Sequence, residues 1–324
     1  MHISSLLGRR PAFTLGLDIG TSSLKLVEIE SRGRTKLIKH CERTPLGRGW
    51  VVDGRIENPH EVSLAIRGLI DKTGTKTRQV ALALPSSAVI TRQVFIPTGL
   101  TELETEQQVE MEACQSIGFP LEELYVDFCV EGVLSDRPDK VAIQIVGTRR
   151  ERIEDLQALC DLSGLKPVVV EIQTASLCRA MARVLRWAPP SSAGAIHLLL
   201  KWGASSVSTQ AFQNCETIYL HSQLCTQSQH PQNTDALLQD IEIGLKQFLE
   251  SAQSGRVEGL YLAGGMALTD GISEQATQAT QIPCGLLDPF EGLALHQGLD
   301  RQAVRKDAVH YARACGLALR ASPW

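Results

Sequence analysis

Alternating apolar and polar positions at the start of the chain predict a β-hairpin. The segment "TLGLDIGTSSLKLVEIE", residues 14–30, has the pattern of a strand, a turn rich in glycine and hydroxyl residues, and a return strand. On the return strand Lys25 shares a face with Val27 and Ile29, so we expect its side chain to point inward, close to the turn. Glu28 is on the opposite face, which we expect to meet water. A buried lysine requires a negative partner, and a phosphate is one candidate.

Beyond this hairpin, strand patterns with a two-residue period alternate with helix patterns whose apolar residues recur every three to four positions. The predicted strands span 79–84, 88–96, 124–133, 140–147 and 166–172, and the predicted helices 59–72, 102–116, 151–163, 174–187, 234–251 and 307–320. This alternation is typical of a mixed or parallel sheet covered by helices. We expect Gly164 to end its helix as a glycine C-cap and Thr269 to begin a later helix as its N-cap.

The opening pattern returns in "AIHLLLKWGASSVSTQAF", residues 195–212, beyond a proline-rich linker candidate, "APPSSAG". Aligning Gly203 on Gly20 brings two serines of each turn into register and places Lys201 on Asp18. A third glycine turn follows in "VEGLYLAGGMALTDGI", between a strand and a helix. Two matched hairpins and this third turn predict two related lobes that face one cleft.

The three turns together favour nucleotide binding. Backbone N–H groups at tight Gly/Ser/Thr turns form concave nests for phosphate oxygens. One turn from each lobe can clamp the β- and γ-phosphates, with Lys25 adding a point charge, while Asp18 is the candidate to hold Mg²⁺ through water. Gly264 and Gly265 leave flat space for a purine and its ribose. The alternative is three ordinary turns, with Lys25 reaching solvent.

The candidate cofactor-binding residues are Asp18, Gly20, Thr21, Ser22, Ser23, Lys25, Gly203, Ala204, Ser205, Gly264, Gly265 and Met266. We assign no catalytic residue.

Composition narrows the function classes. Of the 324 residues, 43% are hydrophobic and 21% charged, as in ordinary soluble globular proteins, and the net charge of −4 gives no reason to expect nucleic-acid or anionic-membrane binding. The nine cysteines contain no C-x-x-C pair, so we read them as reduced apolar side chains of a cytosolic protein. No apolar run approaches the length of a membrane span.

Several motifs resemble the PilM family, the actin-fold cytoplasmic component of type IV pilus assembly. They are "LGLDIGTSSLKLVEIE", "VALALPSSAVITRQVFIP", "GFPLEELYVDF", "LSGLKPVVVEI", "VEGLYLAGGMALTDGI", "DPFEGLAL" and "ACGLALR". The resemblance implies the actin/hexokinase (ribonuclease H-like) α/β fold, with two lobes and a small inserted α+β subdomain. It also implies that the three turns are two phosphate loops and an adenosine loop that bind ATP or ADP with Mg²⁺.

On this resemblance we expect the following domains: a flexible leader (1–13), a first lobe (14–190) with an inserted subdomain at about 79–165, a second lobe (195–306), and a C-terminal helix (307–324) that returns toward the first lobe. The linker candidate, 188–194, separates the lobes.

The resemblance further implies a partner. The family binds the short cytoplasmic N-terminal tail of PilN, a bitopic membrane protein, and thereby joins the inner-membrane alignment complex to the assembly motor. We therefore expect an adaptor at the cytoplasmic side of the inner membrane, with pilus motor ATPases as further partners and no direct membrane insertion. The peptide groove is expected where the inserted subdomain meets the first lobe.

The sequence departs from the family in ways that weaken hydrolysis. Lys201 stands where the family carries an aspartate, and a charged ammonium neither ligates Mg²⁺ nor accepts a proton. It either pairs with a phosphate in place of the metal or bends out to solvent. The family's Phe-Gly-Gly segment and small helical subdomain are also missing before the helix at Thr234. Gln173, which matches a glutamine of actin, is expected to cap a helix rather than to orient a water. We expect ATP hydrolysis to be poor or absent.

Two other functions use the same fold. A sugar or small-molecule kinase would carry an equally good "DIGTSSLK" motif, but it needs a general base for its acceptor hydroxyl, and Lys201 occupies the obvious position. A filament-forming actin homologue is the third possibility, although the missing subdomain removes a usual surface between subunits.

Overall fold

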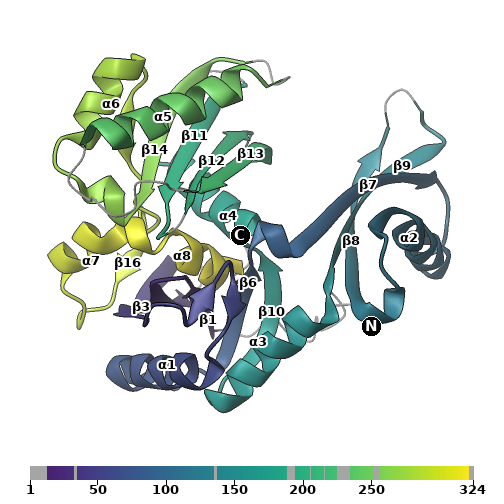
Figure 1. The fold of residues 1–324 in the computed structure, drawn as a ribbon, viewed down its shortest axis with the longest axis horizontal. Helices are drawn as coiled ribbons and strands as arrows, with labels where there is room; N and C mark the ends of the chain where they lie inside the picture. Colours follow the sequence, from purple (N-terminus) through teal and green to yellow (C-terminus); the bar gives the residue numbers. More distant parts are fainter. Residues whose placement is uncertain are drawn as a thin grey trace.

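A six-stranded sheet forms the centre of the first lobe (Figure 1). The computed structural model describes residues 13–32, 35–134, 137–187, 194–204, 206–214, 216–224, 234–251 and 255–320. The strands are β1 (Phe13–Ile19), β2 (Ser23–Arg32), β3 (Thr35–Pro45), β6 (Gln79–Leu84), β10 (Lys166–Ile172) and β16 (Ala294–Leu295), in the order β10-β6-β1-β2-β3-β16. A short ribbon, β4 (Val51–Val52) and β5 (Arg55–Ile56), lies between β3 and α1 (Pro59–Thr73) in the chain.

A five-stranded sheet forms the second lobe and repeats this topology. Its strands are β11 (Ile196–Trp202), β12 (Ser206–Gln213), β13 (Glu216–Leu224), β14 (Val257–Gly264) and β15 (Cys284–Leu286), in the order β13-β12-β11-β14-β15. In both sheets the hairpin strands and the third strand pair antiparallel, and the next two strands pair parallel on the other side of the hairpin's first strand. The predicted relation between the two lobes therefore extends to whole sheets.

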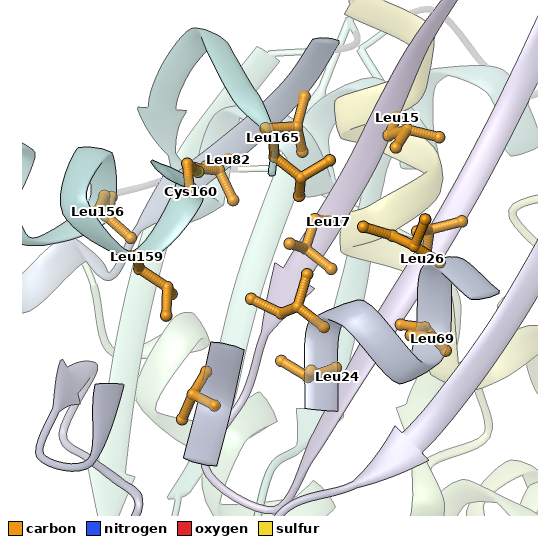
Figure 2. Close-up of a cluster of buried hydrophobic side chains, with 14 of the residues drawn as sticks. Leu15, Leu17, Leu24, Leu26, Leu69, Leu82, Leu156, Leu159, Cys160 and Leu165 are labelled. Atoms are coloured by element: carbon orange, nitrogen blue, oxygen red, sulfur yellow. The ribbon is translucent and has the colours of Figure 1, made fainter. Parts of the chain in front are cut away.

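Helices cover both faces of each sheet because both faces are apolar. On the first lobe, Leu17 and Leu26 of the hairpin pack with Leu69 of α1 and Leu159 of α3 (Arg150–Leu162), as Figure 2 shows. The opposite face packs against α8 (Ala312–Arg320) through a second cluster that includes Val27. On the second lobe, α5 (Thr234–Leu249) and α6 (Ile272–Thr280) cover one face and α4 (Gln173–Leu185) the other.

Because both faces of the first-lobe sheet are covered, the expectation for Glu28 is wrong. Glu28 does not meet water: its side chain is fully buried and accepts hydrogen bonds from Thr75 Oγ1 and Thr77 Oγ1, each at 2.7 Å. Lys39 and His40 of the neighbouring strand β3 add their nitrogens within 4 Å of the carboxylate. Glu28 lies on the same face of β2 as Leu24 and Leu26, and α1 and α3 cover that face.

A separate three-stranded sheet carries the insertion in the first lobe. Its strands are β7 (Val89–Pro97), β9 (Lys140–Arg149) and β8 (Leu124–Val133), in the order β7-β9-β8, and α2 (Glu102–Ile117) packs on one face. Helix α2 begins with a capping box between Thr101 and Glu104. The predicted limits, 79–165, are too wide. Strand β6 belongs to the main sheet, and α3 packs on that sheet's core.

Several local expectations are also settled. Ser163 holds the C-cap position of α3, and Gly164, predicted as the cap, follows it in a left-handed conformation (φ +70°). Thr269 does not cap α6, because Gly271 holds that position and Thr269 ends the short helix η4 (Gly265–Leu268). The predicted helix 307–320 is divided into the end of α7 (Arg301–Asp307), η5 (Ala308–His310) and α8.

Other expectations fall outside the described residues. Of the predicted leader, 1–13, only Phe13 is described, at the start of β1, and of the linker candidate, 188–194, only Gly194. Two further short helices, η2 (Ser86–Ala88) and η3 (Leu121–Glu123), complete the elements. Within the described ranges, no helix is long and apolar enough to cross a membrane.

Candidate functional site

The two predicted hairpin turns have the same hydrogen bond and the same register. Gly20 N donates to Ser23 O at 3.1 Å in the first lobe, and Gly203 N donates to Ser206 O at 2.7 Å in the second. In each hairpin, the second residue pair of the strands, counted from the turn, is Asp18 with Lys25 in the first lobe and Lys201 with Ser208 in the second. The sequence alignment of Lys201 on Asp18 is therefore a structural equivalence.

The three glycine turns line one cavity of about 1210 Å³. Of the candidate residues, the structure brings together Asp18, Gly20, Thr21, Ser22, Ser23, Lys25, Gly203, Ala204, Gly264, Gly265 and Met266 in its wall. Ser205 lies outside the described residues. Its neighbour Ser206 lines the same cavity. This volume is large enough for a nucleotide-sized ligand.

The third turn lies against the second because a glycine permits it. Gly264 has φ +92°, and a Cβ there would come within 1.9 Å of the backbone oxygen of Trp202 at the end of β11. Such an approach between two strand ends excludes any side chain. The next residue, Gly265, faces His310, whose Cε1 lies 3.3 Å from the position of an added Cβ. The space for a purine and its ribose at Gly264 and Gly265 stays a prediction.

Asp18 is the centre of a buried charge cluster. Its Oδ1 lies 3.0 Å from Arg313 Nη2, and its Oδ2 lies 3.7 Å from Lys25 Nζ. Only 5% of the Asp18 side chain is exposed. Burial alone would raise the pKa of Asp18, but the charges of Arg313, Lys25 and Lys201 together hold that pKa below its ordinary value. Asp18 is therefore ionised at neutral pH.

Both lysines of the cluster have lowered pKa values. Burial lowers the pKa of Lys25, against the attraction of Asp18, and Arg313 lowers it further. Burial likewise lowers the pKa of Lys201 to about 7, with Arg313 and Lys25 adding repulsion that Asp18 offsets only in part. Lys25 points inward, as predicted, and donates to Ser23 O at 3.4 Å. Asp18 is its negative partner within the chain.

Sequence reasoning missed Arg313, the third cation of the cluster. It lies on α8, between residues that are all buried, and it is itself 9% exposed. Its Nε is buried and has no hydrogen-bond partner among the described residues. The sequence does contain an indication of this buried arginine, since it is the single charged residue in the apolar run "YARACGLAL". What the sequence does not show is that α8 delivers this arginine to Asp18.

Gln173 also lines the cavity, at the start of α4. The expectation that it caps this helix is wrong, because Ile172 holds the N-cap position and no side chain caps the helix there. Its amide is instead available to the cavity. His310, on η5, is a further lining residue that the sequence did not single out.

The donor set does not suit a divalent cation. Mg²⁺ prefers several oxygen ligands in octahedral geometry. Asp18 is the carboxylate predicted to hold the metal, and each of its oxygens faces a cation. Among the described residues, no group of three or more His, Cys, Asp or Glu side chains can hold a metal. The magnesium role predicted for Asp18 therefore stays a prediction that this donor set does not favour.

Comparison with known proteins gives matches over nearly the whole chain. The sequence model of the family described as "Type IV pilus assembly protein PilM" matches residues 16–234 and 231–322. A solved chain of the "PilM-PilN type IV pilus biogenesis complex" is 24% identical, with a TM-score of 0.78, and the match covers 97% of this chain and 100% of that one.

Two more distant structures are similar in fold. The ethanolamine utilization protein EutJ of Carboxydothermus hydrogenoformans is 12% identical, with a TM-score of 0.53 and coverage of 98% of this chain and 94% of that one. A Bacteroides thetaiotaomicron protein described as having an actin-like ATPase fold is 13% identical, with a TM-score of 0.44 and coverage of 86% and 91%. The duplicated sheet topology and the matches to the chain of the PilM-PilN complex and to EutJ confirm the predicted actin/hexokinase fold class.

Proposed function

The chain belongs to the type IV pilus assembly protein PilM family, and from that premise we propose that it is an adaptor that binds the cytoplasmic tail of a PilN-type membrane protein. The observation that carries this proposal is the match to a chain solved as part of a PilM-PilN complex, which extends over the full length of that chain. The partner would hold the protein at the cytoplasmic side of the inner membrane. Pilus motor ATPases are the further partners that we propose.

We place the peptide groove between the inserted sheet and the first lobe. Val94 and Ile96 of β7 pack against α2, so Phe95 between them points to the opposite face of the sheet. In Figure 1 that face is turned toward the first lobe. Phe95 is 41% exposed there, as is expected of an aromatic residue that a peptide covers on binding.

Calorimetric titration with a synthetic tail peptide tests this groove. We expect wild-type protein to bind the peptide and Phe95→Asp to lose about tenfold or more in affinity, because the change places a charge in an apolar contact. Leu103→Asp is the matched control, since Leu103 is 64% exposed on α2, on the other side of the inserted sheet. Absence of peptide binding, or an equal loss in both variants, would contradict the proposal.

We further propose that the cavity binds a nucleotide and does not hydrolyse it. Hydrolysis needs a group that positions or deprotonates the attacking water. Asp18 is held by Arg313 and Lys25, and Lys201 occupies the equivalent position in the other lobe. A kinase would need a general base near the phosphate turns, and the pairing of Asp18 together with Lys201 at the equivalent position disfavours that alternative. Phosphate release from ATP should stay at background, and brisk Mg²⁺-dependent release that Lys25→Ala abolishes would contradict this.

A further inference from the structure

The two equivalent hairpins present opposite charges to one cavity. Asp18 is the last residue but one of β1, and Lys201 is the last residue but one of β11, so the two have the same position relative to their turns. Lys25 and Arg313 then bring the cluster to three cations around one carboxylate. The whole cavity wall is balanced, because Glu42, Asp53, Asp307 and Arg43 also line it, but the cluster around Asp18 has a local surplus of positive charge that is suited to an anion.

The cations are directed at the first phosphate turn. A Cβ placed on Gly20 would lie 3.1 Å from Lys25 Nζ and 3.7 Å from Arg313 Nη2, so both charged groups reach the backbone of the same turn. Arg313 keeps a buried Nε without a hydrogen-bond partner among the described residues. An unsatisfied buried donor of this kind is costly unless a ligand or water meets it. The turn glycine thus opens a space in which an anion meets two positive side chains at once.

We propose that Lys25, Lys201 and Arg313 hold the phosphate chain of a nucleoside di- or triphosphate directly, so that binding requires no divalent cation. The inference rests on the proposed nucleotide cleft and concerns what neutralises the phosphates there. In metal-dependent sites that charge comes from Mg²⁺ held by carboxylates. Beside the first turn the carboxylate of Asp18 is already paired with Lys25 and Arg313, so a divalent cation placed there would meet these positive groups rather than a free ligand.

Binding of the phosphate chain by these three side chains would be accompanied by uptake of protons from solution. The pKa of Lys201 is about 7, so near neutral pH part of the population lacks its charge. A bound phosphate would favour the charged form and draw a proton from solution. The groups that face Lys201 are Asp18 on β1, Lys25 on β2, Arg313 on α8 and His310 on η5. His310, whose pKa is also lowered, would take up protons in the same direction.

The test is a calorimetric titration of the full chain with ADP and with ATP at neutral pH, once in excess EDTA and once with Mg²⁺. We expect dissociation constants in the two conditions to agree within about threefold, and titrations in two buffers of different ionisation enthalpy to reveal proton uptake. Binding that appears only with Mg²⁺ would overturn the inference and leave the nucleotide cleft standing. Binding in neither condition would overturn both.

Variants make the assignment specific. Lys201→Met should weaken binding in EDTA by about tenfold, the loss expected for one charged contact to phosphate. Lys246→Met is the matched control: this lysine is exposed on α5, pairs with Glu250, and lies outside the cavity wall. An effect of Lys201→Met no larger than that of the control would overturn the role of Lys201.

Lys201→Asp reverses the charge at this position and should therefore change the affinity more than Lys201→Met does. It places a carboxylate opposite Asp18, so binding in EDTA should fall by about a hundredfold and Mg²⁺ should restore about tenfold of it. Thermal unfolding of each variant shows whether it is folded before titration. If Lys201→Asp binds in EDTA as tightly as wild type, the inference is wrong, and Lys201→Met gives an independent answer should the aspartate variant fail to fold.

Discussion

The first-lobe hairpin and the second-lobe hairpin have one backbone and two kinds of chemistry. Their turns share a hydrogen bond, their strands share a register, and both end at the same cavity. The first nevertheless places a carboxylate at its end and the second an ammonium. Because the turn hydrogen bond and the strand register involve only the backbone, a lobe keeps the shape of its turn while the charge beside it changes. In this cleft the backbone sets the shape of each turn, and separate side chains set the charge beside it.

The same two hairpins also differ in how closely a helix approaches them. Gly16 of β1 and Leu199 of β11 are equivalent in register, and each faces a helix between the lobes. A Cβ on Gly16 would lie 2.0 Å from the backbone oxygen of Ala314, so α8 touches the sheet itself. Leu199 instead fills the space beneath α4. The close approach of α8 is what brings Arg313 to Asp18.

The largest effect on stability is expected from a substitution that fills the space between β1 and α8. Gly16→Val must displace the backbone of α8 and should lower the free energy of unfolding by about 3 kcal/mol or more. Leu199→Val places the same residue at the equivalent position of the second lobe. It should lower the free energy of unfolding by only about 1 kcal/mol, because the site loses one methylene. Urea unfolding followed by circular dichroism measures both. Equal losses would mean that the two lobes do not differ in this contact.

A smaller effect is expected from removing the arginine. Arg313→Met leaves Asp18 with the lysines alone and should destabilise the protein by about 2 kcal/mol at neutral pH, because a buried carboxylate loses its hydrogen-bonded partner. The folded pKa of Asp18 lies below the unfolded value, so this stability is present above pH 3.8 and is lost as the pH falls through the folded pKa. The difference from wild type should therefore shrink in acid. A difference that grows in acid would contradict the assignment.

The smallest expected effect is a gain in stability rather than a loss. Lys201→Met should stabilise the protein by about 1 kcal/mol near pH 6, because it removes a charge that burial and two cations disfavour. The pKa of Lys201 is about 7 when folded and 10.5 when unfolded, so the charge is fully destabilising below pH 7 and its cost falls as the pH rises toward 10.5. The gain should diminish over that window. Thermal unfolding between these pH values checks both sign and trend.

Local patterns predicted the parts of the fold that local hydrogen bonds determine. The alternation in 14–30 and 195–212 gave both hairpins, and Gly164 predicted where α3 ends, although Ser163 holds the C-cap position. Strand β3 was not predicted as an element, because its alternating side chains are mostly half-buried and carry charges. The limits of the insertion were also misjudged, since β6 joins the main sheet only through parallel pairing with distant strands.

The sequence by itself determined that two glycine turns would repeat and that Lys201 would stand where Asp18 stands, because a two-residue period and a turn motif are properties of short segments. Only the tertiary structure decided that α8 carries Arg313 to Asp18, almost three hundred residues away in the chain. It also decided that the outer face of β2 is covered, so that Glu28 is buried. Contacts of that range depend on how whole layers pack, and no short segment encodes them.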